Sequence, residues 1–421
     1  MKLIAVQPLG RNRDNARLWI ESQRLDSLGF SAGTPIQIET QPKSLTLRPA
    51  VLAENHVSSR AVAGGRRPII DLANQSILSG LAEYSEVKII TAFERIEVTP
   101  SRRAFAIAKS RTLNPPLRVL EVFAGGGTMT AALDADPCFQ LVAGVEIEPD
   151  FADEWQARDR DATLIQSDIR ALHNSDLPEF DLLIGGIPCT SHSNLGRAKK
   201  SLAGKPELGD TGDLFLPVVS IIADRMPAAV VLENVPAFGT SLAGTLLTTH
   251  LERIGYHIFT TILKPNTEWQ EIEDRQRWLL VATLDRPFSL TPPGTPCITP
   301  VAAYLDAPNP EIDRADAERI AQTIAGLCRH NARHQAAGHG FAFTVIDGME
   351  TKIPTIPKSY HKINTGPFVQ TPFGPRPLRQ DEIERLHGCE LLTHHYSTRC
   401  RFSGKACRHG YSEQSSIRLP P

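Results

Sequence analysis

The fold of this 421-residue chain is decided by the stretch Val119-Leu120-Glu121-Val122-Phe123-Ala124-Gly125-Gly126-Gly127-Thr128. Its apolar residues predict a buried strand, and the three glycines predict a tight turn that leads into a helix. Glycines at such a turn let the backbone approach a ligand closely. Many α/β proteins contain a turn of this kind, so its meaning depends on the sequence around it.

Apolar runs separated by spacers of helix length continue from this stretch to about residue 285. The runs with the length and composition of strands are 118–123, 141–146, 163–167, 181–185, 229–233, 257–264 and 278–283. Continuous apolar strands that alternate with helices are typical of a parallel sheet covered on both faces. The sequence therefore predicts an α/β fold with a doubly wound, mostly parallel, Rossmann-like sheet over residues 117–285.

Residues 1–110 predict a different, β-rich domain, because short segments such as 35–40, 44–47, 87–91 and 95–98 alternate apolar and polar residues. A shift of 51 residues superimposes these segments pairwise, which predicts two similar units that pack together, each preceded by a short helical stretch (20–28 and 71–81). The pattern resembles small swapped-hairpin barrels of the AbrB/SymE type, many of which bind DNA. A structural or dimerisation module is the alternative. Residues 101–116 are interpreted as a solvated connector.

Two carboxylates follow the glycine turn at the ends of the next two predicted strands. Glu146 lies 21 residues after Gly125, and Asp168 follows the third strand. A carboxylate at the first position can accept hydrogen bonds from ribose hydroxyls, and one at the second can accept from an amino group. Together they favour a nucleoside cofactor.

Further polar residues are expected at the same edge of the sheet, where open α/β folds bind ligands. Pro188-Cys189 follows an apolar strand and Gly185-Gly186, so the thiol is expected to be accessible. Glu233 ends the strand 229–233, where burying an acid without a purpose would be costly. Arg275 and Arg277 precede the last strand and can aim guanidinium groups into the same cleft.

These residues resemble, in order and approximate spacing, the motifs of the DNA cytosine-5 methyltransferases. The matching segments are Phe-Ala-Gly-Gly-Gly (123–127), Glu146, Asp168, Pro188-Cys189, Glu233-Asn234-Val235 and Arg275…Arg277. Residues 376–388 resemble that family's ninth motif. The resemblance implies methyl transfer from S-adenosylmethionine to C5 of a flipped cytosine in duplex DNA (EC 2.1.1.37). It also implies that 286–375, Pro-rich with one helix near 311–337, is a target-recognition region. Within 376–421, the sequence predicts a helix over 376–392, which includes the ninth motif, and a basic, structureless tail from residue 393.

The resemblance also implies a role for each residue. The implied cofactor-binding residues are Phe123, Ala124, Gly125, Gly127, Glu146, Asp168, Pro188 and Leu214. The implied catalytic residues are Cys189 as nucleophile at C6, Glu233 and Arg277 on the cytosine, Arg275 beside them, and Asn234 supporting the Pro-Cys loop. No metal is expected. The cations of 194–201 are candidates for closing over the base.

Several positions depart from the family pattern. Glu273 stands in place of Gln, Thr190 follows Pro-Cys, and Cys389-Glu390 replaces Phe-Pro. No Gly-Asn-containing tenth motif is found at the end of the sequence. Two alternatives therefore stay open: a catalytically weak or inactive DNA-binding regulator, and the same chemistry on another cytosine, such as one in tRNA. A nicotinamide dehydrogenase would not explain Pro-Cys together with Glu-Asn-Val.

Composition sets the remaining expectations. Apolar residues make up 41% and charged residues 22%, with a formal net charge of −2, which is typical of a globular protein and excludes a histone-like polycation. Neither an apolar run long enough for a membrane span nor a signal peptide is found. Seven cysteines without a CxxC pair argue against a disulfide framework. We expect a cytoplasmic, nucleoid-associated protein whose candidate partners are duplex DNA, a cognate restriction endonuclease and a second copy bound through the N-terminal domain.

Overall fold

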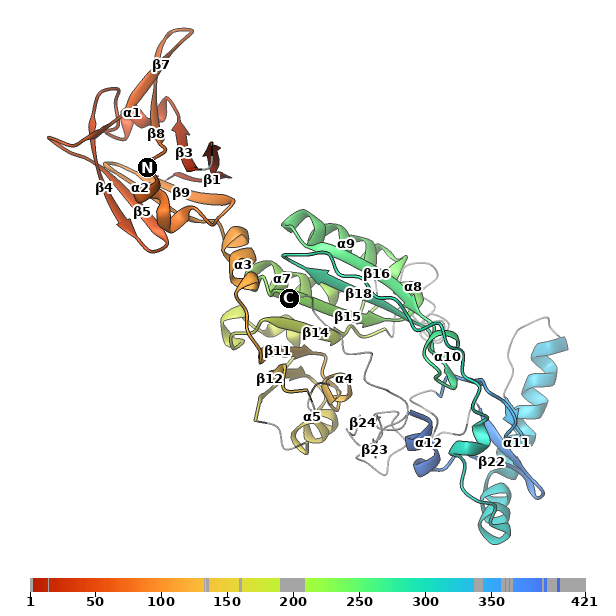
Figure 1. The fold of residues 1–421 in the computed structure, drawn as a ribbon. Coiled ribbons are helices and arrows are strands. Elements are labelled where there is room, and N and C mark those ends of the chain that lie inside the picture. Colours follow the sequence, from red (N-terminus) through yellow and green to blue (C-terminus); the bar gives the residue numbers. More distant parts are fainter. Residues whose placement is uncertain are drawn as a thin grey trace. The chain divides into compact units, whose positions relative to one another are not determined.

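The computed structural model divides the chain into two compact units, Met1–Leu113 and Asn114–Pro421. The described residues are 3–13, 15–131, 133, 136–158, 161–189, 209–336, 344–356, 360, 363, 366–387, 390–391 and 400–401. Figure 1 shows both units as ribbons.

The first unit is built mostly of antiparallel strands. They are β1 (Leu3–Pro8), β2 (Gly10–Asn12), β3 (Asn15–Glu21), β4 (Pro35–Gln41), β5 (Ser44–Pro49), β6 (Asn55–His56), β7 (Ser58–Val62), β8 (Gly65–Leu72), β9 (Glu86–Ala92) and β10 (Arg95–Pro100). The helical segments are α1 (Arg24–Ser27), α2 (Gln75–Leu78), η1 (Ser79–Leu81) and α3 (Arg102–Arg111). The strands form one sheet in the order β1-β9-β10-β5-β4-β6 and another in the order β2-β3-β8-β7.

The 51-residue repeat predicted from the sequence is confirmed, and its two copies interleave. Strand β5 pairs with its counterpart β10, with Leu47 opposite Ile96 and Leu45 opposite Val98. Strand β3 pairs in the same way with β8. Strand β1 crosses to β9, and β6 crosses to β4. The two copies therefore share one hydrophobic core, as expected for units too small to bury a sheet face alone.

In the first unit, one further expectation was confirmed and one was wrong. The predicted helical stretches 20–28 and 71–81 contain α1, and α2 followed by η1, respectively. The predicted connector contains helix α3, whose N-cap Ser101 accepts a hydrogen bond from the backbone N–H of Ala104 at 3.1 Å. Ala104 and Ala106 are buried. A capped, partly apolar helix is stable where the cationic composition alone suggested a solvated linker.

The second unit contains the predicted Rossmann-like sheet. Its strands are β11 (Leu117–Val122), β12 (Phe139–Glu146), β13 (Thr163–Gln166), β14 (Leu182–Gly186), β15 (Ala229–Asn234), β16 (His257–Leu263) and β18 (Arg277–Thr283). They lie in the order β13-β12-β11-β14-β15-β18-β16. All seven predicted strands are confirmed. The sheet is mixed rather than purely parallel, because β18 runs antiparallel to both β15 and β16.

Short helices follow the strands of this sheet. They are α4 (Thr128–Ala131), α5 (Pro149–Gln156), η2 (Ile169–Ala171), η3 (Asn174–Asp176), α7 (Phe215–Arg225), α8 (Pro236–Gly239), α9 (Leu242–Ile254) and α10 (Pro265–Glu268). Among the described residues no helix has the length and apolar character needed to cross a membrane.

The region after residue 285 has more structure than the sequence predicted. It contains η5 (Val301–Tyr304), α11 (Pro310–Ala336), β19 (Val345–Ile346), β20 (Ile353–Pro354), β21 (Phe368–Thr371), β22 (Gly374–Pro377) and α12 (Gln380–His387). The long helix and the helix of the ninth motif are confirmed. The short strands were missed, because two to four residues carry no readable alternation. A core that includes Val301, Tyr360 and Leu378 holds the region together.

The structure describes little of the C-terminal tail. Strands β23 (Glu390–Leu391) and β24 (Cys400–Arg401) pair with each other. The tail was predicted to be structureless from residue 393, so β24 corrects that prediction at two residues. The rest of the tail, like the predicted cationic loop 194–201 and Thr190, lies outside the described residues.

Candidate active site

Three functional side chains predicted from the sequence come together at one edge of the seven-stranded sheet. Strands β14 and β15 are parallel, and Gly186 lies opposite Glu233 near their carboxyl ends. Strand β18 is antiparallel to β15, so it begins at the edge where β15 ends. Cys189 after β14, Glu233 in β15 and Arg277 in β18 therefore share this edge, as the sequence predicted.

Glu233 and Arg277 form an ion pair between the carboxylate and the guanidinium Nε. Their side chains keep 31% and 21% of their surface exposed. Gly186 leaves the space that this pair needs, because a Cβ at that position would lie 3.2 Å from Glu233 Oε2 and 3.6 Å from Met129 Cε. Gly186, two residues before Pro188, thus leaves room for the Glu233 carboxylate next to the loop that carries Cys189.

Burial shifts each of these groups towards its neutral form. Burial raises the pKa of Cys189, the nearby Glu233 charge raises it further, and Arg277 and Arg275 oppose the shift. Burial also raises the pKa of Glu233 although Arg277 favours the carboxylate. The pKa of Arg277 is lowered by burial and then by Arg275. The loss of hydration around this partly exposed pair disfavours the charged forms by more than the ion pair favours them. The result is a thiol beside a carboxyl that retains its proton unusually well.

Asn234 joins the two strand ends. It is 1% exposed, its Nδ2 donates to the carbonyl of Ile187 at 3.1 Å, and its Oδ1 accepts from the backbone N–H of Val235 at 2.8 Å. The bond to Ile187 fixes the backbone immediately before Pro188 and Cys189. Asn234 therefore contacts the backbone next to the Pro-Cys loop, which the resemblance implied that it supports.

The arginines follow a short strand that connects this edge to the region after residue 285. Strand β17 (Glu273–Asp274) pairs with β20, and buried Glu273 accepts a hydrogen bond from the backbone N–H of Ile356 at 2.9 Å. The residue that departs from the family pattern therefore has a clear structural partner. Arg275 lies between this anchor and Arg277, and its charge reaches Cys189 and Glu233.

The glycine turn is shaped by one carboxylate. Phe123, Gly125 and Gly127 have positive φ angles of 55°, 54° and 74°. Glu146 is 7% exposed. Its Oε2 accepts from the N–H of Gly125 at 2.6 Å, while its Oε1 accepts from the N–H groups of Ile147 and Glu148 at 3.0 and 2.9 Å. Glu146 therefore ties the turn after β11 to the end of β12.

The other predicted cofactor residues surround the same turn. A Cβ on Gly125 would meet nothing within 4 Å, so open space lies against this backbone. Asp168 caps η2 through the N–H of Arg170 at 2.9 Å, and the Arg170 side chain, which binds it, lowers the pKa of that carboxyl. Ala124 and Leu214 are buried, and Phe123 and Pro188 are half-buried. A tight turn, an acidic strand end and open space suit a nucleoside ligand.

A buried trio beneath the turn was missed from the sequence. Glu121 in β11 is 1% exposed, and its Oε2 accepts from Thr130 Oγ1 at 2.7 Å and from Trp155 Nε1 at 3.1 Å. Trp155 lies over Gly144, where a Cβ would come within 2.7 Å of the indole. Glu121 thus connects α4 and α5 under the turn. The sequence signal that could have indicated this trio is Glu121 itself, a single acidic residue inside an apolar strand.

Comparison with known proteins places this site in a family. Residues 117–391 match the family described as C-5 cytosine-specific DNA methylase. The chain is 28% identical over 278 residues to the type II methyltransferase M.NlaX of Neisseria lactamica, covering 64% of this chain and 85% of that protein. It is 31% identical over 172 residues to the orphan methyltransferase M.SPRI of Bacillus phage SPR, covering 39% and 37%.

Solved structures share the fold. The Dnmt2 methyltransferase of S. pombe superimposes with a TM-score of 0.51 at 18% identity, over 68% of this chain and 92% of that one. The methyltransferase EhMeth of Entamoeba histolytica gives 0.51 at 16% identity, over 68% and 92%. At these identities the likeness concerns the fold alone.

Proposed function

The chain belongs to the family of C-5 cytosine-specific DNA methylases, and from this premise we propose which of its residues carry out the reaction. The protein is a DNA cytosine-5 methyltransferase that uses S-adenosylmethionine as methyl donor. The proposal covers the roles of Cys189, Glu233, Arg277, Arg275 and Asn234, and of the residues around the glycine turn.

The residues around the glycine turn fit S-adenosylmethionine. When bound, it supplies an electrophilic methyl group. Glu146 holds the ribose hydroxyls, Phe123 covers one face of the adenine, and Asp168 accepts from the adenine amino group. Gly125 and Gly127 let the backbone approach the ligand, and Ala124, Pro188 and Leu214 complete the lining. The open space next to Gly125 and the acid that fixes its N–H support this assignment.

Cys189 is the nucleophile in this proposal. Its thiolate adds to C6 of cytosine, which makes the otherwise unreactive C5 electron-rich enough to take up a methyl cation equivalent. Loss of the C5 proton to a base then breaks the bond between Sγ and C6 and restores the ring. Because a thiol cannot reach C6 inside a stacked duplex, the cytosine must be flipped out of the helix.

Glu233 and Arg277 hold the cytosine ring. A protonated Glu233 donates a hydrogen bond to N3 and offsets the negative charge that builds up there when Cys189 adds. Arg277 binds the O2 side, with Arg275 adding positive charge. Their ion pair is the resting arrangement that the base replaces. Asn234 positions Cys189 through the carbonyl of Ile187.

One observation carries the proposal: Cys189, Glu233 and Arg277 meet at the carboxyl edge of the sheet, where burial raises the pKa of the Glu233 carboxyl against the pull of two arginines. A carboxyl held in this way is suited to donate a proton near neutral pH. A structural ion pair would need no neighbouring thiol.

Methyl transfer from tritiated S-adenosylmethionine to mixed genomic duplex DNA tests this proposal. The expected result is 5-methylcytosine in the digested DNA, made by the wild type and not by Cys189→Ala. A matched control is Cys297→Ala, which removes a buried thiol from the core of the region after residue 285. Transfer that survives Cys189→Ala would overturn the assignment. A folded wild type that binds DNA without transferring would favour the regulator considered from the sequence.

Finer assignments complete the proposal. We place the enzyme among the type II methyltransferases (EC 2.1.1.37), with a restriction endonuclease as cognate partner, residues 286–375 as target-recognition region and the nucleoid as its location. Self-association through the first unit is supported by edge strand β1, where Ile4 and Val6 are 58% and 56% exposed. Sedimentation of the full chain, with and without Ile4→Lys/Val6→Lys, tests self-association. Resistance of expressed plasmid DNA to restriction enzymes with cytosine-containing sites tests the type II assignment.

A further inference from the structure

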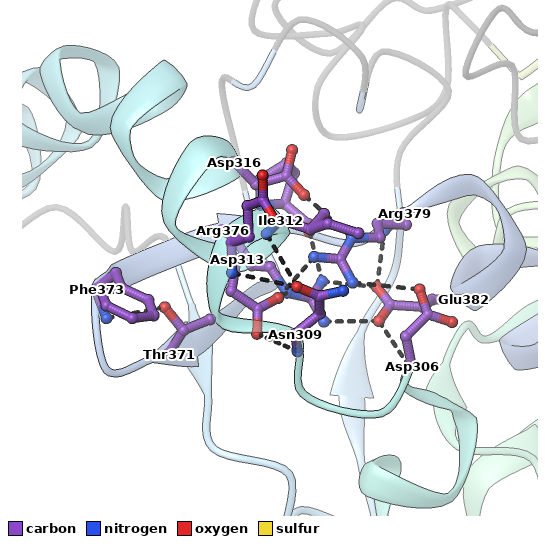
Figure 2. Close-up of polar contacts among 12 residues, drawn as sticks. Asp306, Asn309, Ile312, Asp313, Asp316, Thr371, Phe373, Arg376, Arg379 and Glu382 are labelled. Carbon is purple, nitrogen blue, oxygen red and sulfur yellow. Dashed lines mark hydrogen bonds and ion pairs between the residues drawn. The ribbon is translucent and has the colours of Figure 1, made fainter.

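Helix α11 (Pro310–Ala336) consists of two halves with different surroundings. The first half is held by a buried cluster of charged groups, drawn in Figure 2. Arg376 and Glu382 are 3% and 0% exposed, and two hydrogen bonds of 2.8 and 2.7 Å join them. Asp313 of α11 is 5% exposed, and its Oδ1 lies 2.6 Å from Arg379 Nη2. Asp313 Oδ1 also lies 3.2 Å from Arg376 Nε, so the first half is tied to β22 and to the residue before α12.

Apolar contacts continue this anchor for only part of the helix. Ile320 and Ile324 are buried with Phe368 of β21 in one small cluster. Beyond Ile324 the helix adds only Leu327, which is partly buried against the same cluster. A helix segment with so little apolar burial gains little from packing, so its composition is free to serve another purpose.

The second half of α11 is basic. Residues 310–324 contain four carboxylates, whereas 325–336 contain none and carry Arg329, Arg333, His330 and His334. No acidic residue occurs between Glu318 and Asp347. Arg329 and Arg333 are exposed, one turn apart, and Arg333 Nε donates to the carbonyl of Arg329 at 3.4 Å. Like charges at this spacing repel each other, and a nearby anion would relieve that repulsion.

We propose that the second half of α11, residues 325–336, contacts the phosphates of duplex DNA through Arg329 and Arg333, while the cluster of Asp313, Arg376, Arg379 and Glu382 positions the helix. The inference rests on DNA as the substrate, and the charge complementarity of the segment supports it. Sequence-independent phosphate contacts fix the protein on the duplex and leave base reading to other residues.

The alternative is that Arg329 and Arg333 only stabilise the helix, through their favourable interaction with the negative end of its dipole. It differs from the proposal in a measurable way. Phosphate contacts release counterions, so binding weakens with salt at a slope of about 0.9 per contact. A dipole contribution changes helix stability and leaves this slope untouched.

The test is equilibrium binding of the full chain to a fluorescent duplex of random sequence, without S-adenosylmethionine, over a range of salt. Arg329→Gln/Arg333→Gln is expected to lower the salt slope by about 1 to 2 and to weaken binding about tenfold at roughly 0.1 M salt. The matched control is Arg314→Gln/Arg319→Gln, two exposed arginines in the anchored half, for which the slope stays unchanged. Arg329→Lys/Arg333→Lys retains the charge and is expected to retain the slope.

An unchanged slope in the Arg329→Gln/Arg333→Gln protein, or an equal loss in the control, would overturn the inference, as would a wild type that does not bind duplex DNA. Circular dichroism checks that the helix is retained. Methyl transfer by the wild type at saturating DNA separates the two proposals. If transfer occurs but the Arg329→Gln/Arg333→Gln protein has the wild-type salt slope, this inference alone is refuted. If the variant has the lower slope but the wild type transfers no methyl group, only the catalytic roles are refuted.

Discussion

Two arginine–carboxylate pairs in the second unit have opposite settings. Arg376 and Glu382 are almost fully buried, and the two Glu382 oxygens accept two bonds from the guanidinium, one from the N–H of Asp306 and one from the N–H of Arg379. Glu233 and Arg277 are partly exposed, and their neighbours are a thiol and a second arginine. The hydrogen-bonding capacity of the first carboxylate is used by protein groups, whereas in the proposed mechanism the second carboxylate exchanges its partner for the cytosine.

The difference teaches that saturation, more than burial, separates a structural ion pair from a reactive one. A buried carboxylate that accepts from four donors is held in place by them. At Glu233 burial raises the pKa in spite of Arg277 and Arg275, so the group can move a proton. The predictions below are arranged to break this comparison or to sharpen it.

The largest effect is expected at the saturated pair. Arg376→Met leaves Glu382 buried without its main partner, and removing one member of such a pair costs about 3–5 kcal/mol of unfolding free energy. Urea denaturation measures it. The double variant Arg376→Met/Glu382→Leu removes both charges and is expected to recover part of that loss. A double variant less stable than the single one would mean that the stranded charge is not the cause.

At the reactive pair the loss falls on activity. Glu233→Gln retains the shape but removes the proton donor, and kcat/KM for methyl transfer is expected to fall about a hundredfold or more, while the unfolding free energy changes by less than about 1 kcal/mol. Glu382→Gln is the matched substitution at the other pair, with the larger stability loss. If Glu233→Gln cost stability instead of activity, the two pairs would be alike.

The pH dependence of the rate distinguishes the pairs further. Addition needs Cys189 deprotonated and Glu233 protonated, and the pKa of both groups is raised. The rate is therefore expected to rise with pH by about tenfold per unit on the acid side and to fall on the alkaline side. Glu233→Gln, which cannot lose a proton, is expected to lose the alkaline fall. A fall that persists in this variant would belong to another group.

The smallest effect is expected at the rim of the saturated cluster. Arg379 Nε binds Asp316, whose side chain is 21% exposed, at 3.1 Å. Exposed pairs contribute little, so Asp316→Asn is expected to cost less than about 1 kcal/mol, whereas Asp313→Asn, in the buried centre, is expected to cost more. Thermal unfolding of both variants measures the two losses of stability. Equal losses would show that burial does not determine how much each carboxylate of the cluster contributes.

The placement of Cys189 and Glu233 could be predicted because it depends on local sequence. The end of an apolar run marks where a strand ends, and parallel strands end together, so Cys189 and Glu233 could be expected at one edge. The 51-residue repeat could also be predicted from local sequence, because its alternating segments match each other directly. The antiparallel direction of β18 was not predicted, because strand direction depends on packing between distant segments.

The saturated cluster escaped prediction for a physical reason. Asp313 meets Arg379 across 66 residues of sequence, and nothing near either residue indicates the other. Arg376 and Glu382 were noticed only as part of a motif, and the burial that gives them their role comes from β22, α11 and α12 together. Helix α3 was missed because four cations in ten residues suggested a solvated segment, whereas Ser101 and two buried alanines stabilise it.

The central claim is that Cys189 bonds covalently to C6 of cytosine, and a duplex containing 5-fluorocytosine tests it most directly. Fluorine at C5 cannot leave as a proton would, so the adduct formed after methyl transfer cannot resolve. We predict a denaturation-resistant protein–DNA complex that requires S-adenosylmethionine, with mass spectrometry locating the bond on Cys189, and no complex with Cys189→Ala. A bond to another residue, or methylation of cytosine without trapping on the fluorinated duplex, would contradict the account.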